Sequence, residues 1–429
     1  MIAKERTYMC IDMRTFYASV ECAERSLNPF ETNLVVADLT RGKNALCLAI
    51  SPKLKAQGVK NRCRLSDIPK SIKYEVAPPR MQLYIEYSAD IYGLYLKYFD
   101  PADIHVYSID ESFIDVTGYL ETYKKTPKEL AKFIMNEIAD ELHIPSTVGI
   151  GTNLFLAKIA LDITAKHSKD HIGYLNEELF KETLWDHRPI TDFWMIASGT
   201  ARRLEKYGVT TMRQIANFPE NLLYKTFGIN AELLIDHAWG RESCRISDIK
   251  NYKTRSKSVS FSQILPRDYS YEEAKTVMIE MAFNGYRELV KRHVITKKVQ
   301  VGIGYSRDRH ESTAAAVRLS SATALSSKLK PAVEQAFEKA AVKGIPIRRL
   351  AIAFNDVCDE GCEGYDLFTD WNSIEKEKAR DKAVLELTEK YGKNAVLRGI
   401  NFMDGATQRE RNEMIGGHRA GYDDPRRKS

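Results

Sequence analysis

Two adjacent carboxylates stand inside an apolar stretch of the chain, HVYSIDESFIDVTGY, at residues 105–119. Asp110 and Glu111 are flanked on both sides by residues that are typical of a buried strand. Neighbouring residues on a strand point to opposite faces, so both acids can serve one site only if the chain bends sharply between them. The pattern therefore predicts a β-hairpin that carries Asp110 and Glu111 at its tip.

A third carboxylate, Asp12, lies near the end of the stretch TYMCIDM, which predicts a strand followed at once by a helix. If this strand neighbours the hairpin, three acids converge at one end of one sheet. Such a cluster repels itself and is costly to desolvate unless divalent cations neutralise it. Oxygen ligands suit Mg²⁺ or Mn²⁺, and two such ions about 3.5–4 Å apart can promote a phosphoryl displacement. The alternative is a pair of surface acids at a turn, which the apolar flanks disfavour.

Two lysines could meet the charge of a nucleoside triphosphate. Lys55 lies in SPKLKAQGV and Lys166 in DITAKHSKD, each in a predicted helix that follows a core strand. The alternative for either residue is an ordinary solvated lysine. The sequence contains no G-x-x-x-x-G-K-[ST], H-E-x-x-H or G-x-S-x-G pattern, which argues against a P-loop enzyme, a zinc protease of that type and an α/β-hydrolase.

The elements that must position these residues predict a large α+β protein. The chain has 429 residues, which is too long for one compact core. Small helices are expected from 171 to 240, residues 255–356 read as β-α-β-β-α-β, and residues 357–429 read as a tail with one helix. The net charge is +6, and the segment from about 240 to 330 is clearly basic. Such a segment indicates a phosphate-binding surface or, alternatively, an ordinary solvated face.

The sequence also limits where the protein works. No apolar run approaches the length of about 18 residues that a membrane span requires, and the start MIAKERTYMCIDM offers no signal-peptide core. The seven cysteines are an odd number and are scattered, which suits a reducing compartment better than a disulfide framework. We therefore expect a cytoplasmic protein with no membrane partner.

Three stretches together, CIDMRTFYASVE, YSIDESFIDVTGY and VGIGTNLFLAKIALDITAK, resemble the signature stretches of Y-family translesion DNA polymerases. The resemblance runs from residue 1 to about 356 and is closest to the UmuC-like, UV-damage-repair branch of Gram-positive bacteria. It implies an α+β right-hand architecture with a palm (1–18 and 79–170), fingers (19–78), a helix-hairpin-helix-like thumb (171–240), a basic linker (241–254), a little finger (255–356) and a C-terminal tail (357–429).

The resemblance implies roles for individual residues. Asp12, Asp110 and Glu111 would be the catalytic acids and, with the Met13 carbonyl, would hold two Mg²⁺ ions. The nucleotide-binding residues would be Phe16, Tyr17, Lys55 and Lys166. Tyr17 matches the steric gate, whose ring leaves no room for a ribose 2′-hydroxyl, whereas the alternative for Phe16 is a core residue. Lys55 matches less well, because Pro52 stands where an aromatic residue is often found.

The resemblance also implies contacts with DNA and with a sliding clamp. Arg255, Lys257 and Arg318 would lie along the duplex phosphates, which positions DNA without reading its sequence. At the thumb turn, WMIASGT has Met195 and Ala197 where glycines are common, so we expect a weaker or altered phosphate contact there. In the tail, EGYDLFTD resembles a clamp-binding pentapeptide through Leu367 and Phe368, with a chance packing contact as the alternative.

The function that these features favour is template-directed DNA synthesis of the low-fidelity translesion type, during DNA damage tolerance and the SOS response. The primer 3′-hydroxyl would attack the α-phosphate of a deoxynucleoside triphosphate. Expected partners are primer–template DNA, deoxynucleoside triphosphates and a bacterial sliding clamp, and the protein is expected to be a monomer that joins the nucleoid when it acts. The alternatives are another palm-type enzyme such as a nucleotidyl cyclase, a non-catalytic DNA-binding or accessory protein of repair, and a metal-dependent nuclease.

Overall fold

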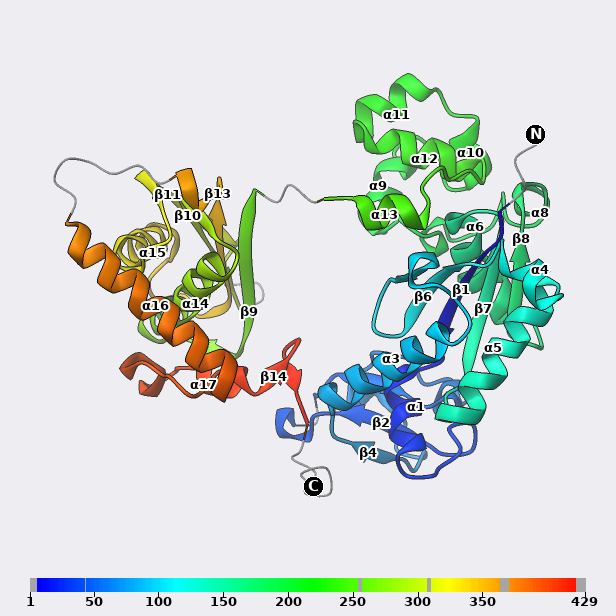
Figure 1. The fold of residues 1–429 in the computed structure, drawn as a ribbon, viewed down its shortest axis with the longest axis horizontal. Helices are drawn as coiled ribbons and strands as arrows, with labels where there is room; N and C mark the ends of the chain where they lie inside the picture. Colours follow the sequence, from blue (N-terminus) through cyan, green and yellow to red (C-terminus); the bar gives the residue numbers. More distant parts are fainter. Residues whose placement is uncertain (1–5, 43, 254–256, 307–309, 363–369, 422–429) are drawn as a thin grey trace. The chain divides into compact units, whose positions relative to one another are not determined.

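The structure is a computed structural model that describes residues 6–42, 44–253, 257–306, 310–362 and 370–421. The chain divides into two compact units, Met1–Tyr252 with His418–Ser429, and Lys253–Gly417. Each unit combines helices with a sheet (Figure 1), so the predicted α+β multidomain class is confirmed. No helix within these described ranges is long and apolar enough to cross a membrane.

The central sheet of the first unit brings the start and the middle of the chain together. Its strand order is β5 (Ile104–Val106), β6 (Glu111–Asp115), β1 (Tyr8–Met13), β7 (Ser146–Gly151) and β8 (Ile172–Leu175). β1 runs antiparallel to both β6 and β7, and Met9, Cys10 and Ile11 of β1 are completely buried. The end of β1 therefore lies beside the beginning of β6.

Helices pack on this sheet where the sequence provides the signals for them. α5 (Pro127–Leu142) begins with the expected capping box, in which the Thr126 hydroxyl accepts from the Glu129 N–H at 3.3 Å. α6 (Leu154–Ile159) packs closely on β7 because Gly149 and Gly151 face it. A Cβ atom on either glycine would overlap the backbone of Ala157. This close approach places α6 next to the end of the sheet where β6 begins.

A second, small sheet and a group of helices complete the first unit. The small sheet has the order β3 (Cys47–Ile50), β2 (Leu34–Ala37) and β4 (Glu75–Ala77). The remaining helices are α1 (Phe16–Ala23), α2 (Pro52–Ala56), α3 (Met81–Leu96), α4 (Tyr119–Tyr123), α7 (Ala165–His167), α8 (Glu177–Thr183), α9 (Ser198–Glu205), α10 (Met212–Ala216), α11 (Glu220–Phe227), α12 (Asn230–Ala238) and α13 (Ile246–Asn251). The core of α9 to α12 is continuous with the apolar face of α6.

One expectation for this region is wrong. The segment from 171 to 240 is not all helical, because β8 pairs in parallel with β7 and buries Ile172 and Leu175 in the central sheet. Within the predicted basic linker 241–254, α13 buries Ile246 against the same sheet. β8 has only four residues, and Ile246 is a single buried apolar residue in a basic segment. Neither feature produces a clear periodic pattern in the sequence.

The second unit has the predicted β-α-β-β-α-β order. Its sheet is arranged as β11 (Thr313–Thr323), β10 (Val294–Tyr305), β12 (Ile347–Asn355) and β9 (Ser258–Tyr269), and β13 (Cys358–Asp359) pairs with β10. The helices α14 (Tyr271–Lys291) and α15 (Ser326–Ala340) pack on one face of this sheet and form its core. On the opposite face the described residues of these strands are mostly exposed or half-buried, among them Ser260, Gln300 and Arg318, and we call it the open face.

The described residues from 358 to 417 belong to the second unit. They include α16 (Trp371–Tyr391), α17 (Gln408–Asn412) and β14 (Met414–Ile415), whereas β15 (His418–Arg419) belongs to the first unit. The buried carboxylate of Glu280, on α14, accepts hydrogen bonds from the Asn401 side chain (2.8 Å) and from the backbone N–H groups of Thr407 (2.8 Å) and Gln408 (3.2 Å). These bonds attach the predicted C-terminal segment to α14.

Candidate active site

The structure brings the three predicted acids to the same end of the central sheet. Asp12, the last residue but one of β1, pairs directly with Glu111, the first residue of β6. Asp110 precedes β6, and its carbonyl oxygen accepts from the Met13 N–H at 2.9 Å. The Tyr107 N–H donates to the Glu111 carbonyl at 2.9 Å and closes the predicted hairpin. The predicted bend between Asp110 and Glu111 is thus the place where the turn ends and strand β6 begins.

Burial together with the neighbouring acids changes the pKa of Asp12. Burial raises the pKa of Asp12 to about 7, and the charges of Asp110 and Glu111 add to the effect. Such a carboxyl group is half protonated near neutral pH, and a divalent cation would return it to the charged form. The donors are all oxygen atoms, which suits Mg²⁺ or Mn²⁺ better than Zn²⁺. The residues present therefore fit a divalent metal site.

The side chains of the three acids are not arranged as metal ligands in this structure. No group of three His, Cys, Asp or Glu side chains in the described part of the chain is placed to hold a metal ion as it stands. The Asp110 carboxylate accepts from the Ser108 hydroxyl at 2.7 Å, and the Glu111 carboxylate is bound by Lys158. Neighbouring carboxylates that repel each other are stabilised by nearby hydrogen-bond donors. Ser108 and Lys158 are those donors in this structure.

Lys158, on α6, is a component of the site that our sequence analysis did not identify. Its Nζ lies 2.7 Å from Glu111 Oε2 and 3.1 Å from Asp162 Oδ2, and its side chain is 10% exposed. Burial by itself lowers the pKa of Lys158, but Cys10, Asp162 and Glu111 outweigh it and the pKa is raised. The available signal was a lone lysine within the apolar stretch NLFLAKIA.

Lys166 lies at the outer end of the same charge network. Asp162 stands in a π-helical segment, Ala160–Thr164, between the two lysines, and its Oδ1 lies 3.8 Å from Lys166 Nζ. The Lys166 side chain is 61% exposed. The structure therefore connects Lys166 with Glu111 only through Asp162 and Lys158. Short π-helical segments occur frequently at functional sites, where they shift the direction of side chains by one position.

Tyr17, on α1, lies close to the acids and is supported from behind. Burial raises the pKa of Tyr17, and the charge of Asp110 raises it further. The Tyr17 ring stacks on Tyr84 of α3, with centroids 4.6 Å apart and an interplanar angle of 18°. The buried Tyr84 hydroxyl donates to Glu21 Oε1 at 2.7 Å, and Arg80 donates two bonds to the same carboxylate, at 2.9 and 2.8 Å. This network fixes the ring behind Tyr17.

Phe16 and Lys55, two further predicted nucleotide-binding residues, differ in their exposure to solvent. Phe16 is 3% exposed and belongs to the core, which was the alternative for it. Lys55 is exposed on α2. A cation that the sequence analysis did not name, Arg62, acts on the site, because its charge opposes the rise in the pKa of Tyr17. Arg62 lies in a loop with a left-handed φ of 57°, so no periodic pattern marks it.

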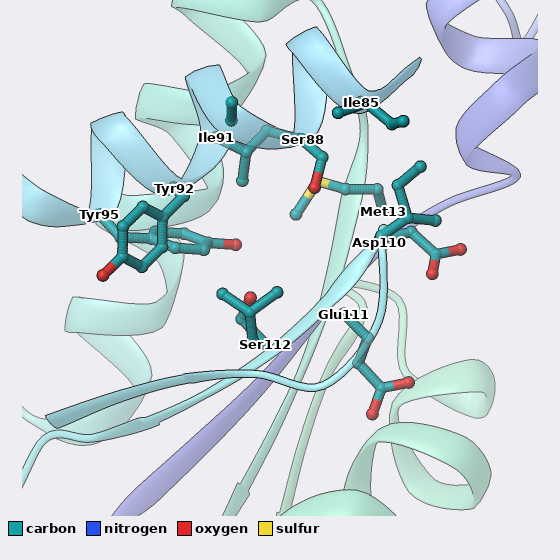
Figure 2. Close-up of a pocket in the computed structure, with 12 residues that line it drawn as sticks. Met13, Ile85, Ser88, Ile91, Tyr92, Tyr95, Asp110, Glu111 and Ser112 are labelled. Atoms are coloured by element: carbon teal, nitrogen blue, oxygen red, sulfur yellow. The ribbon is translucent and has the colours of Figure 1, made fainter. Parts of the chain in front are cut away.

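A cavity of about 270 Å³ lies behind the hairpin, between it and α3. Val106 and Ile109 line it on the hairpin side, and Ile91 and Tyr95 line it on the helix side. The buried Tyr95 hydroxyl has no hydrogen-bond partner. Figure 2 shows the Asp110 and Glu111 carboxylates directed away from this cavity. The hairpin is therefore incompletely packed on the side that faces α3.

The turn before α9 has the backbone conformation that glycine favours. Met195 adopts a left-handed φ of 69°, and its side chain is 56% exposed. This conformation is uncommon for residues with a Cβ atom, which agrees with the expectation that glycine is common at this position. The preceding residue, Trp194, points to the active-site hairpin, where its Nε1 donates to Tyr107 Oη at 3.0 Å.

The open face of the second sheet carries the predicted DNA contact Arg318. Arg318 is exposed on β11 and pairs with Lys298 of β10, which pairs in turn with Asn355 of β12. The next two rows of this face contain mainly Ala, Gly and Ser, and Arg349 follows beyond them. Lys257 is exposed just before β9. Arg255 and the clamp-motif residues Leu367 and Phe368 lie outside the described residues.

Comparison with known proteins covers most of the chain. Residues 11–162 match the impB/mucB/samB family, and residues 256–367 match the C-terminal domain of the same family. A protein of Bacillus subtilis strain 168 that is named for UV-damage repair, UvrX, is 32% identical over 97% of this chain and 98% of its own length. DNA polymerase IV 2 of the same organism is 31% identical over 97% of this chain and 99% of its own length.

A solved structure has the same fold. The Y-family DNA polymerase chimera Dbh-Dpo4(243-245)-Dbh superposes with a TM-score of 0.62. The match covers 82% of this chain and 99% of the chimera, at 21% sequence identity. At this level of identity the likeness concerns the fold, and it agrees with the right-hand architecture expected from the sequence.

Proposed function

Because the chain belongs to the impB/mucB/samB family, we propose that it is a template-directed DNA polymerase of the low-fidelity translesion type. The family implies a DNA substrate and the use of divalent metal ions. The observation that supports the proposal best is the convergence of Asp12, Asp110 and Glu111 at one end of a sheet, beside Tyr17. A pair of acids that served only as a solvated surface turn would not be expected beside a third acid in a half-buried site, because burying several carboxylates together costs free energy.

The three acids, with the Met13 carbonyl, would hold two Mg²⁺ ions, and Mn²⁺ could replace them. When bound, these ions would supply activation of the primer 3′-hydroxyl and neutralisation of the departing pyrophosphate. The chain's own residues provide position and charge. Ser108 orients the Asp110 carboxylate, and Lys158 Nζ pairs with the Glu111 carboxylate at 2.7 Å. Lys166 and Arg62, at the edge of the site, would attract the triphosphate.

Tyr17 would select deoxynucleotides by shape. Its ring is backed by Tyr84 at 4.6 Å, so it cannot retreat to admit a ribose 2′-hydroxyl. We expect Tyr17→Ala to raise the efficiency of ribonucleotide relative to deoxynucleotide incorporation by at least about tenfold, since a steric exclusion is removed. Single-nucleotide insertion with each sugar measures the ratio. Tyr17→Phe keeps the ring and should keep the selection; equal ratios in all three proteins would contradict this role.

The open face of the second sheet would lie along the DNA backbone. Arg318 and Lys298 offer adjacent positive charges, and the Ala, Gly and Ser rows beside them allow a phosphate backbone to approach closely. Contacts of this kind carry no sequence information, which suits an enzyme that must accept any template. The proposals that Arg255 and Lys257 continue this surface, and that Leu367 and Phe368 bind a sliding clamp, rest on the sequence.

Primer extension tests the proposed function directly. Purified protein should lengthen a labelled primer with Mg²⁺ and four deoxynucleotides, and should also extend it past an abasic site in the template. A protein that shortens the primer would be a nuclease, and one that binds the DNA without extending it would be an accessory factor. Repeating the reaction with a bacterial sliding clamp shows whether the clamp raises the length of the products.

A further inference from the structure

A three-ring cluster joins the active-site hairpin to the helices of residues 171–240. The Trp194 Nε1–H donates to the Tyr107 hydroxyl at 3.0 Å, and the two rings meet edge to face with centroids 5.9 Å apart. Both rings also contact Phe113 of β6, at 6.0 Å from Trp194 and 5.7 Å from Tyr107. Trp194 is thus one point at which the helical segment contacts the hairpin that carries the acids.

Trp194 can keep Tyr107 in position because contacts with α12 fix the Trp194 ring itself. Its ring stacks on His237 of α12, with centroids 6.2 Å apart and an interplanar angle of 17°. His237 is buried, lies 3.0 Å from Glu242 and stacks at 4.0 Å on Phe155 of α6. The indole therefore rests on the core that connects α6 with α12.

The hairpin needs such a contact. Behind it lies the cavity of about 270 Å³, so packing from that side does not determine its position. On the other side, the Tyr107 N–H bonds the Glu111 carbonyl at 2.9 Å, and Lys158, the partner of Glu111, lies 6.0 Å from the Tyr107 ring centroid. A shift of the Tyr107 ring would therefore displace the residues that set the Glu111 carboxylate.

We infer that Trp194 is a positioning residue for the carboxylate hairpin, acting through its hydrogen bond to Tyr107. The inference rests on the proposed function in so far as the hairpin is the metal site of a polymerase. Trp194 also precedes Met195 and the start of α9, the turn at which a DNA phosphate is expected. The contact thereby links the place where the helical segment meets DNA to the geometry of the acids.

Conservative variants isolate this hydrogen bond. Trp194→Phe and Tyr107→Phe each keep a ring and remove one partner. We expect each to lower the single-turnover rate of nucleotide addition roughly 3- to 10-fold, the range for one net hydrogen bond, with the Kd for primer–template DNA unchanged within twofold. The double variant should be no slower than the slower single variant, because both changes remove the same bond. Trp185→Phe is the control, since its N–H bonds only Ala238, at 2.7 Å, within the helical segment.

A second measurement does not depend on polymerase activity. Titration with Mn²⁺ in the absence of DNA, followed by the electron paramagnetic resonance of free Mn²⁺, should show roughly 3- to 10-fold weaker binding in Trp194→Phe and Tyr107→Phe only. Mn²⁺ binding without primer extension in the wild type would remove the proposed function and leave the inference to be decided by this titration. Unchanged Mn²⁺ affinity and rate in both variants, or additive losses in the double variant, would overturn it, as would a wild type that binds no Mn²⁺.

Discussion

Asp110→Asn should abolish primer extension while leaving the protein folded. The substitution keeps the size of the side chain but removes one of the three charges that would bind the metal ions, a loss of several kcal/mol or about 10³-fold or more in rate. It also removes like charge from beside Asp12, whose pKa is raised to about 7 by burial and by the neighbouring acids. The thermal midpoint should therefore stay the same or rise. Single-turnover extension and a melting curve measure the two effects.

Asp90→Asn provides the matched control, because Asp90 is exposed on α3. This variant should extend primers at the wild-type rate. Retention of activity in Asp110→Asn would sink the assignment of the catalytic acids, whereas loss of activity together with a lower midpoint would point to a structural role for Asp110.

Glu21→Gln should cost the first unit about 3 kcal/mol of its free energy of unfolding. Glu21 is completely buried and accepts hydrogen bonds from Arg80, Arg25 and Tyr84. Replacing the buried charge with a neutral amide leaves the partly buried Arg80 guanidinium without its closest counter-ion, and breaking such a pair is strongly destabilising. Denaturant unfolding, with tryptophan fluorescence as the signal, measures the difference. The control is Glu24→Gln at the C-terminal cap of the same helix, whose partly exposed ion pair with Arg80 is 3.6 Å long and should contribute less than about 1 kcal/mol.

The effect of Glu21→Gln should depend on pH. Burial raises the pKa of the Glu21 carboxyl, but the bonds from Arg80, Arg25 and Tyr84 outweigh burial, so the pKa lies below the ordinary value of 4.5. The stabilisation from the charge is therefore fully present above pH 4.5 and is lost as the pH falls through the folded-state pKa. A difference between wild type and variant that grew on acidification would contradict this account.

The residues of the candidate site could be predicted from the sequence where a charged residue stands in an otherwise apolar stretch. Asp110 and Glu111 were visible because charges stand among apolar residues, and Asp12 because an acid ends a core strand. The structure confirms the hairpin and the pairing of Asp12 with Glu111. The resemblance to Y-family polymerases is also confirmed by the family matches. The roles of these residues in metal and nucleotide binding stay predictions.

Residues that act through the tertiary structure were missed. Lys158 looks like an ordinary helical lysine until α6 packs on Gly149 and Gly151 and brings it to Glu111. Trp194 looks like a core aromatic until the hairpin presents Tyr107 to its N–H. In both cases the partners are separated by tens of residues, so no local pattern could link them.

The sequence by itself determined most of the element types, with β8 and α13 as exceptions, and also the order of the second unit and the identity of the three acids. These follow from local periodicity, capping and turn signals, which depend on neighbours along the chain. Only the tertiary structure decided that β8 and α13 join the first unit, that the segment after 357 bonds to Glu280, and that Lys158 holds Glu111. These depend on which surfaces meet, because a short strand or a buried ion pair is stable only against the partner that the fold supplies.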